Sequence, residues 1–152
     1  MINESHLQHI LTLFGPHNCI RYSQLHEADT ANRSILIIDN FGMLSSIYRY
    51  GTFSYIGGGF GRGIHNILEA LTFGQPVCFG PNYEKFQEAK NILALGGGKS
   101  YEKAHELISI LTLWMSSPEA CQQAAQQSRQ YVEDNIGSTE RILNLVESHL
   151  NR

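Results

Sequence analysis

The residues best suited to chemistry lie together in the segment 55–70, which reads YIGGGFGRGIHNILEA. Five of the seven residues from 57 to 63 are glycines, and Arg62 stands among them. Glycine permits positive φ angles and lets the backbone approach a ligand closely. A helix that begins directly after such a loop adds unpaired amide groups and a partial positive charge. The segment therefore predicts a site for a phosphate or a carboxylate, to which Arg62 can add a bidentate contact.

The loop residues that we assign to this site are Gly58, Gly59, Arg62 and Gly63. The alternative is a flexible turn that binds nothing, but so many glycines between a strand and a helix favour a ligand. On this interpretation, a Gly59→Val variant is expected to fold and to lose the anion site.

The helix predicted over residues 64–73 separates apolar from polar side chains. The apolar residues recur at i, i+3, i+4 and i+7 and are expected to face a sheet: Ile64, Ile67, Leu68 and Leu71. The polar residues on the other side are His65, Asn66 and Glu69, and they would face the loop. A carboxylate at Glu69 can accept hydrogen bonds from both hydroxyls of a ribose. The alternative for Glu69 is an ordinary exposed glutamate.

The elements around this segment alternate between strands and helices. Apolar runs predict strands over 19–22, 34–39, 52–56 and 76–79, of which SILIID and PVCF are typical of parallel strands buried on both faces. Helices are predicted over 4–14, 42–50, 64–73, 83–95, 102–115, 118–135 and 138–150. This order predicts an α/β fold: a Rossmann-like, doubly wound parallel sheet with helices on both faces.

Ligands of such sheets bind outside the carboxyl ends of the strands, so a second strand end also enters the predicted site. Asn40, Phe41, Gly42 and Met43 follow the SILIID run. Their backbone amides and the Asn40 side chain can contact a base or a sugar. The alternative is a capped helix start, since Asn before an apolar run is a common cap.

Other motifs are absent or incomplete. No register of the glycine loop gives G-x-G-x-x-G, the dinucleotide fingerprint. Gly98-Lys99-Ser100 resembles the end of a P-loop, but Leu93 replaces the first glycine and a helix precedes the segment. We interpret it as a helix C-cap with a loop, without ATP binding. The three cysteines are widely spaced and the seven histidines form no H-E-x-x-H pair, so no metal site is expected.

Composition limits the class of protein. The chain has 152 residues, of which 42% are hydrophobic and 16% charged, as expected for one globular domain. Its net charge of -3 argues against binding of nucleic acid. We find no signal peptide and no apolar run of the roughly 20 residues that a membrane span needs, so a soluble chain is expected.

Four stretches together resemble the transferases of 3-deoxy-D-manno-octulosonic acid (Kdo), which belong to the GT-B glycosyltransferases. The family's C-terminal domain carries I-D-x-x-G-x-L, G-G-(S/G)-x-x-x-x-G-x-H-N-x-L-E-(A/P), G-x-P-V-x-F-G-P and F-x-E in this order. The corresponding stretches here are residues 38–44, 57–70, 74–81 and 86–88. The sequence departs from many members at Ile67, where they have Pro, and at Met43, where they have Glu.

This resemblance implies a donor-binding domain that holds CMP-Kdo without a metal or a cofactor. Glu69 would bind the ribose, Asn66 and the glycine loop would bind the phosphate or the Kdo carboxylate, and the turn at 41–44 would pack on the cytosine. It implies no catalytic residue in this chain, because the family's catalytic base lies in an N-terminal domain. That domain also binds the lipid A precursor and carries the membrane anchor.

We therefore expect residues 1–152 to be a single nucleotide-sugar-binding domain. It would lack the N-terminal domain and a first strand, and would be inactive alone. The parent enzyme would work at the cytoplasmic face of the bacterial inner membrane. Two alternatives stay open. One is the donor domain of another GT-B enzyme, either a UDP-sugar transferase or a UDP-sugar 2-epimerase. The other is a non-catalytic doubly wound module that binds a partner protein.

Overall fold

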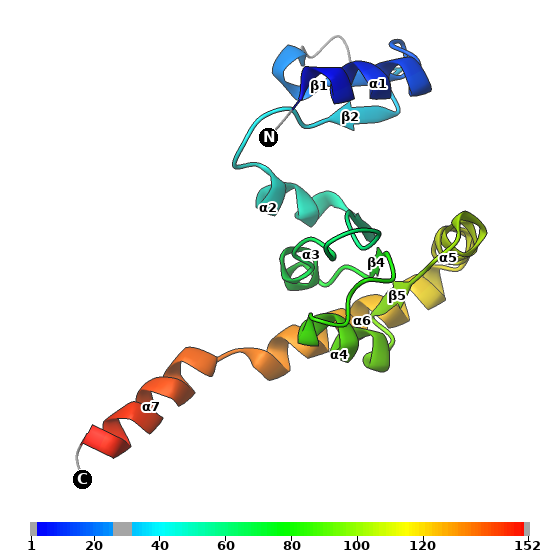
Figure 1. Ribbon diagram of the computed structural model, residues 1–152. Helices are drawn as coiled ribbons and strands as arrows, with labels where there is room; N and C mark the ends of the chain where they lie inside the picture. The colour runs from blue at the N-terminus through cyan, green and yellow to red at the C-terminus, as the bar shows by residue number, and fades with distance from the viewer. Residues whose placement is uncertain (1–2, 26–31, 151–152) are drawn as a thin grey trace. The chain divides into compact units, whose positions relative to one another are not determined.

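The computed structural model describes residues 3–25 and 32–150 of the chain (Figure 1). The chain divides into two compact units, Met1–Ile47 and Tyr48–Arg152, and each is described by itself. None of the helices in the described ranges is both long and apolar enough to cross a bilayer.

The first unit pairs two parallel strands under one long helix. Its elements are α1 (Glu4–Phe14), β1 (Cys19–Arg21), a 3-10 turn (Tyr22–Gln24), β2 (Ile35–Ile37) and α2 (Leu44–Ile47). The Asn3 side chain accepts a hydrogen bond from the Ser5 amide and so caps α1 at its start. Leu7 of α1 packs against Cys19 and Ile37.

The prediction for the strand over 34–39 is wrong in length and in burial. Strand β2 spans only Ile35–Ile37, and its central residue Leu36 is 47% exposed. The apolar cluster around α1 takes in Ile35 and Ile37, which lie on the other face of the strand. An apolar run therefore does not by itself show that a strand is buried on both faces. Burial of both faces also requires an element packed against each of them.

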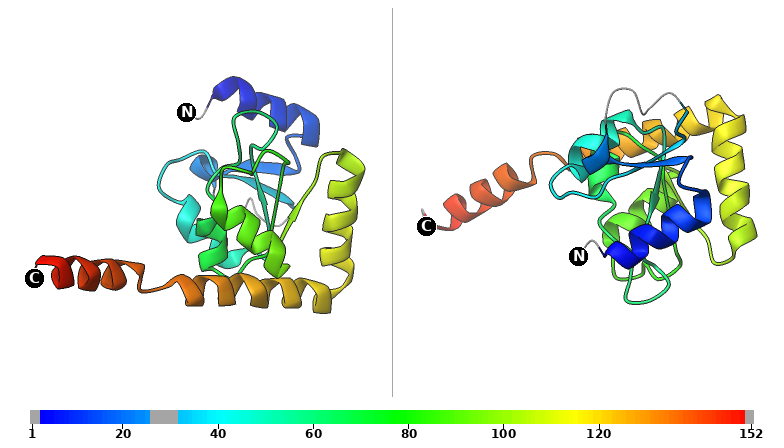
Figure 2. Two further views of the ribbon diagram at one scale, coloured as in Figure 1. Left: turned by 60° about the horizontal axis from the view of Figure 1, so that its bottom comes forward. Right: turned by 90° about the horizontal axis from the view of Figure 1, so that it is seen from above.

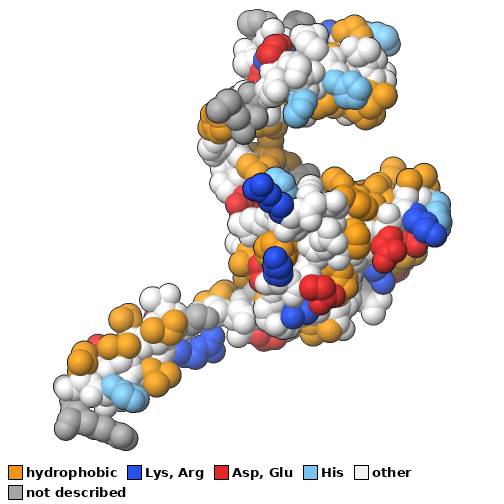
Figure 3. Space-filling model, in the orientation of Figure 1, with side chains coloured by type: hydrophobic (Ala, Val, Ile, Leu, Met, Phe, Trp, Pro, Cys, Tyr) orange, Lys and Arg blue, Asp and Glu red, His pale blue; other side chains and the backbone are white. Residues whose placement is uncertain are grey.

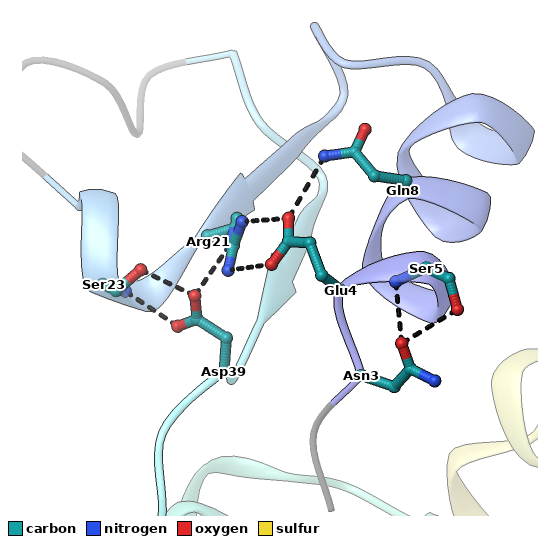
Figure 4. A network of polar contacts seen from close by, with 7 residues as sticks. All are labelled: Asn3, Glu4, Ser5, Gln8, Arg21, Ser23 and Asp39. Carbon is teal, nitrogen blue, oxygen red and sulfur yellow. Dashed lines mark hydrogen bonds and ion pairs between the residues drawn. The ribbon is translucent and has the colours of Figure 1, made fainter.

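A network of charged side chains joins the elements of the first unit (Figure 4). Arg21 donates to both carboxylate oxygens of Glu4, at 2.9 and 3.2 Å, and through Nε to Asp39 Oδ2 at 2.8 Å. Asp39 also accepts from the Ser23 amide at 3.0 Å and from the Ser23 hydroxyl at 2.6 Å. The Ser23 hydroxyl and the Arg21 guanidinium lower the pKa of Asp39 to about 2. Asp39 thus fixes the chain where it leaves β2.

The second unit is built on three parallel strands in the order β3 (Ser54–Ile56), β4 (Val77–Phe79) and β5 (Gly98–Ser100). The central strand β4 is fully buried, as predicted for PVCF. Val77 and Phe79 enter a cluster with residues of α3 and α4, whereas Cys78 faces Trp114 and Cys121 of α5 and α6. Helices therefore cover both faces of this sheet, which confirms the predicted α/β class.

The helices of this unit are α3 (Leu68–Thr72), α4 (Gln87–Leu95), α5 (Ala104–Ser116), α6 (Pro118–Asn135) and α7 (Ser138–Leu150), with a 3-10 turn at Tyr48–Tyr50 (Figure 2). Helix α6 contacts α3, α4 and α5. It begins with Pro118, and the Ser117 hydroxyl accepts a hydrogen bond from the Ala120 amide as its cap. Helix α7 exposes the apolar residues Ile142, Leu143, Leu145 and Val146 (Figure 3).

Strand β5 corrects our interpretation of residues 98–100 as a loop. Gly96 does end α4 in the left-handed conformation, as predicted, but the chain then pairs with β4 as an edge strand. A Cβ atom on Gly97 would lie 2.6 Å from Ile92 Cδ1 and 2.8 Å from Ser128 Oγ. The glycines at this position therefore let the strand approach α4 and α6 closely, which is one of the uses of glycine next to strands.

The stability of the first unit is expected to depend on pH through Asp39. The pKa of Asp39 is lowered in the folded chain, so its contribution is present above the unfolded pKa of 3.8 and is lost as the pH falls through about 2. An Asp39→Asn variant should unfold at lower urea concentration at pH 7, and its deficit should shrink between pH 4 and 2. Urea unfolding at several pH values measures this, with Glu140→Gln on α7 as the control. A deficit that stays constant down to pH 2 would contradict the role of the Asp39 charge.

Candidate functional site

The glycine loop is a closed turn fastened by its own backbone. After β3, Gly58 and Ile64 form an antiparallel bridge. The Gly59 amide donates to the Gly63 carbonyl at 2.7 Å, and the His65 amide donates to the Gly57 carbonyl at 3.0 Å. Gly58 and Gly59 have φ angles of 85° and 83°, in the left-handed region that favours glycine. These hydrogen bonds close the turn between Gly57 and His65.

The loop is also fastened to the chain that leaves β4. The Asn82 amide donates to the Gly59 carbonyl at 2.9 Å, and the Asn82 side chain donates to the Gly61 carbonyl at 3.1 Å. A Cβ atom on Gly59 would lie 2.6 Å from the Cα atom of Gly80. The loops after two neighbouring parallel strands therefore touch through their backbones at the carboxyl edge of the sheet, where ligands of such folds bind.

The helix predicted to begin at Ile64 begins only at Leu68. The bridge to Gly58 keeps Ile64 extended, so the helix cannot begin directly after the loop. Ile64, Ile67 and Leu71 are buried as predicted, but Leu68 is 43% exposed, so its assignment to the sheet-facing side is wrong. The first turn of α3 therefore does not supply amide groups at Gly63 as we predicted.

Asn66 and Glu69 form a small, connected group at the start of α3. The Asn66 side-chain oxygen accepts a hydrogen bond from the Leu68 amide at 3.0 Å, and its nitrogen donates to Glu69 Oε1 at 3.0 Å. Asn66 thus starts the helix and orients the carboxylate with one side chain. His65 is exposed and its ring lies over Gly58. Arg62 is exposed at the tip of the loop, and within the described ranges no hydrogen bond or ion pair holds it.

The other predicted site residues lie in the first unit, where they form a turn of their own. Gly42 has a φ angle of 87°, the Asn40 side chain contacts Met43 Sδ at 3.1 Å, and Phe41 is 81% exposed. The Met43 carbonyl accepts the Ser46 and Ile47 amides and so starts α2. The structure thus groups Gly58, Gly59, Arg62, Gly63, His65, Asn66 and Glu69 in the second unit, and Asn40, Phe41, Gly42 and Met43 in the first.

An aromatic group that we did not predict from the sequence lies beside the loop. The ring of Phe60 lies 5.4 Å from that of Tyr101, and the Tyr101 hydroxyl lies 2.9 Å from the Tyr55 hydroxyl. Burial raises the pKa of the Tyr101 hydroxyl. Tyr101 and His105 are among the residues that line a hollow of about 620 Å³ at the carboxyl ends of β4 and β5. The one available signal was an aromatic residue, Phe60, among five glycines.

Metal binding finds no support in this geometry. Among the residues that the structure describes, no three His, Cys, Asp or Glu side chains gather where they could hold an ion. What the site offers is a hydrogen-bonded backbone turn, the exposed cation of Arg62 and an oriented carboxylate at Glu69.

The contact of Gly59 with Gly80 gives a reason to expect that a side chain at Gly59 destabilises the fold. Gly59→Ala should already lower the free energy of unfolding by about 1–2 kcal/mol, the cost of a left-handed L-residue, and by more if the Gly80 backbone cannot shift. Gly61→Ala is the matched control, because a Cβ atom there meets nothing within 4 Å and its φ angle is not positive. Chemical denaturation compares the two, and equal stability of both variants would rule out the close approach.

Comparison with known proteins gives a consistent result. No family model matches the chain. It is 29% identical over 119 residues to the 3-deoxy-D-manno-octulosonic acid transferase of Rickettsia conorii, over 76% of this chain and 26% of that protein. Identity to the transferase of Rickettsia prowazekii is 32% over 107 residues, or 68% of this chain and 23% of that one. The chain thus spans about a quarter of the length of these relatives.

The fold is also similar to that of a solved structure. The crystal structure of the C-terminal CMP-Kdo binding domain of WaaA from Acinetobacter baumannii matches with a TM-score of 0.71 and 22% sequence identity, over 84% of this chain and 67% of that one. By its sequence relatives, the chain belongs to the family of 3-deoxy-D-manno-octulosonic acid transferases.

Proposed function

We propose that this chain binds CMP-Kdo as the donor-binding part of a Kdo transferase. The observation that carries the proposal is the fixed pair of Asn66 and Glu69 beside the closed glycine loop, at the carboxyl edge of β3. A nucleotide sugar needs both parts of this arrangement: an acceptor for ribose hydroxyls and donors for anionic groups. The names of the sequence relatives and of the structural neighbour support the same donor.

In this proposal Glu69 binds the ribose. Its Oε1 atom is held by the Asn66 amide, so a ribose hydroxyl can donate to a carboxylate that is already oriented. Orienting the carboxylate beforehand lowers the entropy lost on binding. Arg62, which no other described residue holds, is available for the phosphodiester or the Kdo carboxylate.

Asn40, Phe41, Gly42 and Met43 are proposed to supply the contacts to the cytosine. The exposed ring of Phe41 and the positive φ angle of Gly42 support this role, since both leave ring and backbone surface open to a ligand. These contacts stay a prediction, as do the individual roles of Gly58, Gly63 and His65.

The larger protein is proposed to transfer Kdo to a lipid A precursor during lipopolysaccharide synthesis in Gram-negative bacteria. We place its catalytic base, its acceptor site and its membrane association outside residues 1–152, and the whole enzyme at the cytoplasmic face of the inner membrane. The proposal uses no metal and no cofactor. On this view the chain alone binds the donor and transfers nothing.

Nucleotide preference tests the proposal. Calorimetric titration of the chain with CMP, UMP and UDP is expected to show binding of CMP in preference to the two uridine nucleotides. Preference for UDP would replace the proposal with another GT-B donor domain. Binding of none of the three would contradict donor binding by this chain and favour the non-catalytic module.

The role of Glu69 has a sharper test. Glu69→Gln keeps an oxygen that can accept from Asn66 but removes the negative charge. Because hydrogen bonds to charged groups contribute about 1.5–3 kcal/mol, CMP should bind about tenfold more weakly, or worse. Glu140→Gln on α7, an exposed position outside both the loop and the hollow, is the control and should bind CMP as the unmodified chain does. Equal affinities of both variants would remove Glu69 from the site.

A further inference from the structure

A separate hollow of about 560 Å³ lies at the amino ends of β3 and β4. The glycine loop follows the carboxyl end of β3, so the hollow and the proposed donor site lie at opposite ends of this strand. Its walls come from the segments before the two strands, from the end of α5 and from α6, all within the second unit. Its volume falls within the range of about 300–1,000 Å³ that is usual for small-molecule pockets.

The inner wall of the hollow is aromatic and already packed. The rings of Phe53 and Trp114 lie 5.6 Å apart and are tilted by 43°, and Trp114 is only 3% exposed. The lining also includes Phe73 and Met115, which are 36% and 75% exposed. Methionine adapts readily to ligands of different shape. This wall suits a flat or aliphatic body.

The buried polar group of the hollow, Gln75, is already used. It is 2% exposed, accepts from the Ser54 hydroxyl, and donates to the carbonyls of Tyr48 and Gly51, the latter at 2.9 Å. All its hydrogen-bonding atoms therefore have partners inside the protein. A ligand must find its polar partner elsewhere in the lining.

The charged residue of the lining is Arg129 on α6. Its stem crosses Gly74, where a Cβ atom would lie 2.4 Å from both Cγ and Nε of Arg129. Neither of the ion pairs among the described residues involves Arg129, and no hydrogen bond within those ranges uses its guanidinium. The lining contains no acidic residue. A cation is thus placed beside an aromatic wall without a counter-charge.

We propose that this hollow binds a small monocarboxylate with an apolar body. The body packs on Phe53 and Trp114, and the carboxylate forms a bidentate pair with Arg129, a geometry that the guanidinium favours. The site is independent of the proposed function, because none of the residues assigned to the donor lines it.

The chain carries its own reporter for the test, since Trp114 is its single tryptophan and lines the hollow. Titration with octanoate, below its micelle-forming concentration, should change the tryptophan fluorescence in a saturable way. 1-Octanol has the same chain without the charge and should bind at least tenfold more weakly. Absence of a saturable change with octanoate, or equal binding of octanol, would overturn the proposal without any variant.

Two variants separate the parts of the site. Arg129→Gln should weaken octanoate at least tenfold and leave octanol unchanged, whereas Arg141→Gln on α7 should change neither. Ala125→Phe adds a ring within the lining and should weaken both ligands. Circular dichroism establishes that each variant is folded. Unchanged octanoate binding in either Arg129→Gln or Ala125→Phe would overturn the assignment of this hollow.

Discussion

Gly59 and Gly80 bring the loops after β3 and β4 into backbone contact, and the geometry of the candidate site depends on this approach. A Cβ atom on either residue would lie less than 3 Å from backbone atoms of the other loop. The contact aligns the Gly59 carbonyl with the Asn82 amide and closes the turn between Gly59 and Gly63. Once the turn is closed, Arg62 is left at its tip and Asn66 follows at its base. The positions of the ligand-binding groups therefore follow from a packing constraint.

The same constraint changes how the glycines are understood. The sequence suggests that they leave room for a ligand, and the structure shows that Gly58 and Gly59 first leave room for the protein itself. Gly61 differs, because a Cβ atom there would meet nothing within 4 Å and its φ angle is not positive. A glycine-rich loop can therefore be rigid. Its rigidity is an advantage for binding, since an ordered loop loses little entropy when the ligand arrives.

Much of the fold was predictable from periodicity. The bounds of α1 and α7 agree with the predicted ranges, α6 agrees as well, and β4 is buried as its apolar run indicated. These elements carry long or strong patterns. Strand β5 was missed because Gly98-Lys99-Ser100 has no strand-like pattern, and it forms only because β4 offers a free edge. The late start of α3 was missed because a backbone bridge between Ile64 and Gly58 outweighs the helical spacing of the apolar residues.

The candidate site was predictable in composition and less so in arrangement. We predicted Asn66 and Glu69 as site residues because both would lie on the polar side of a helix over residues 64–73. In the structure α3 begins at Leu68, so this reason holds for Glu69 and not for Asn66. Their contact is set by an Asn66 side chain that also accepts a hydrogen bond from the Leu68 amide, which spacing alone cannot indicate. The aromatic contact of Phe60 with Tyr101 joins residues 41 positions apart, and such pairs carry no local signal.

Gln75 has a consequence for how this sequence can vary over evolutionary time. Within the matched stretch 74–81 it occupies a position that the family pattern leaves open, yet its side chain must donate twice and accept once inside the protein. Glutamate cannot donate, methionine has no amide donor or acceptor, and asparagine is one methylene group shorter than glutamine. A substitution of Gln75 is therefore expected to require further changes in the segment 48–54, which contains all three hydrogen-bond partners of its side chain.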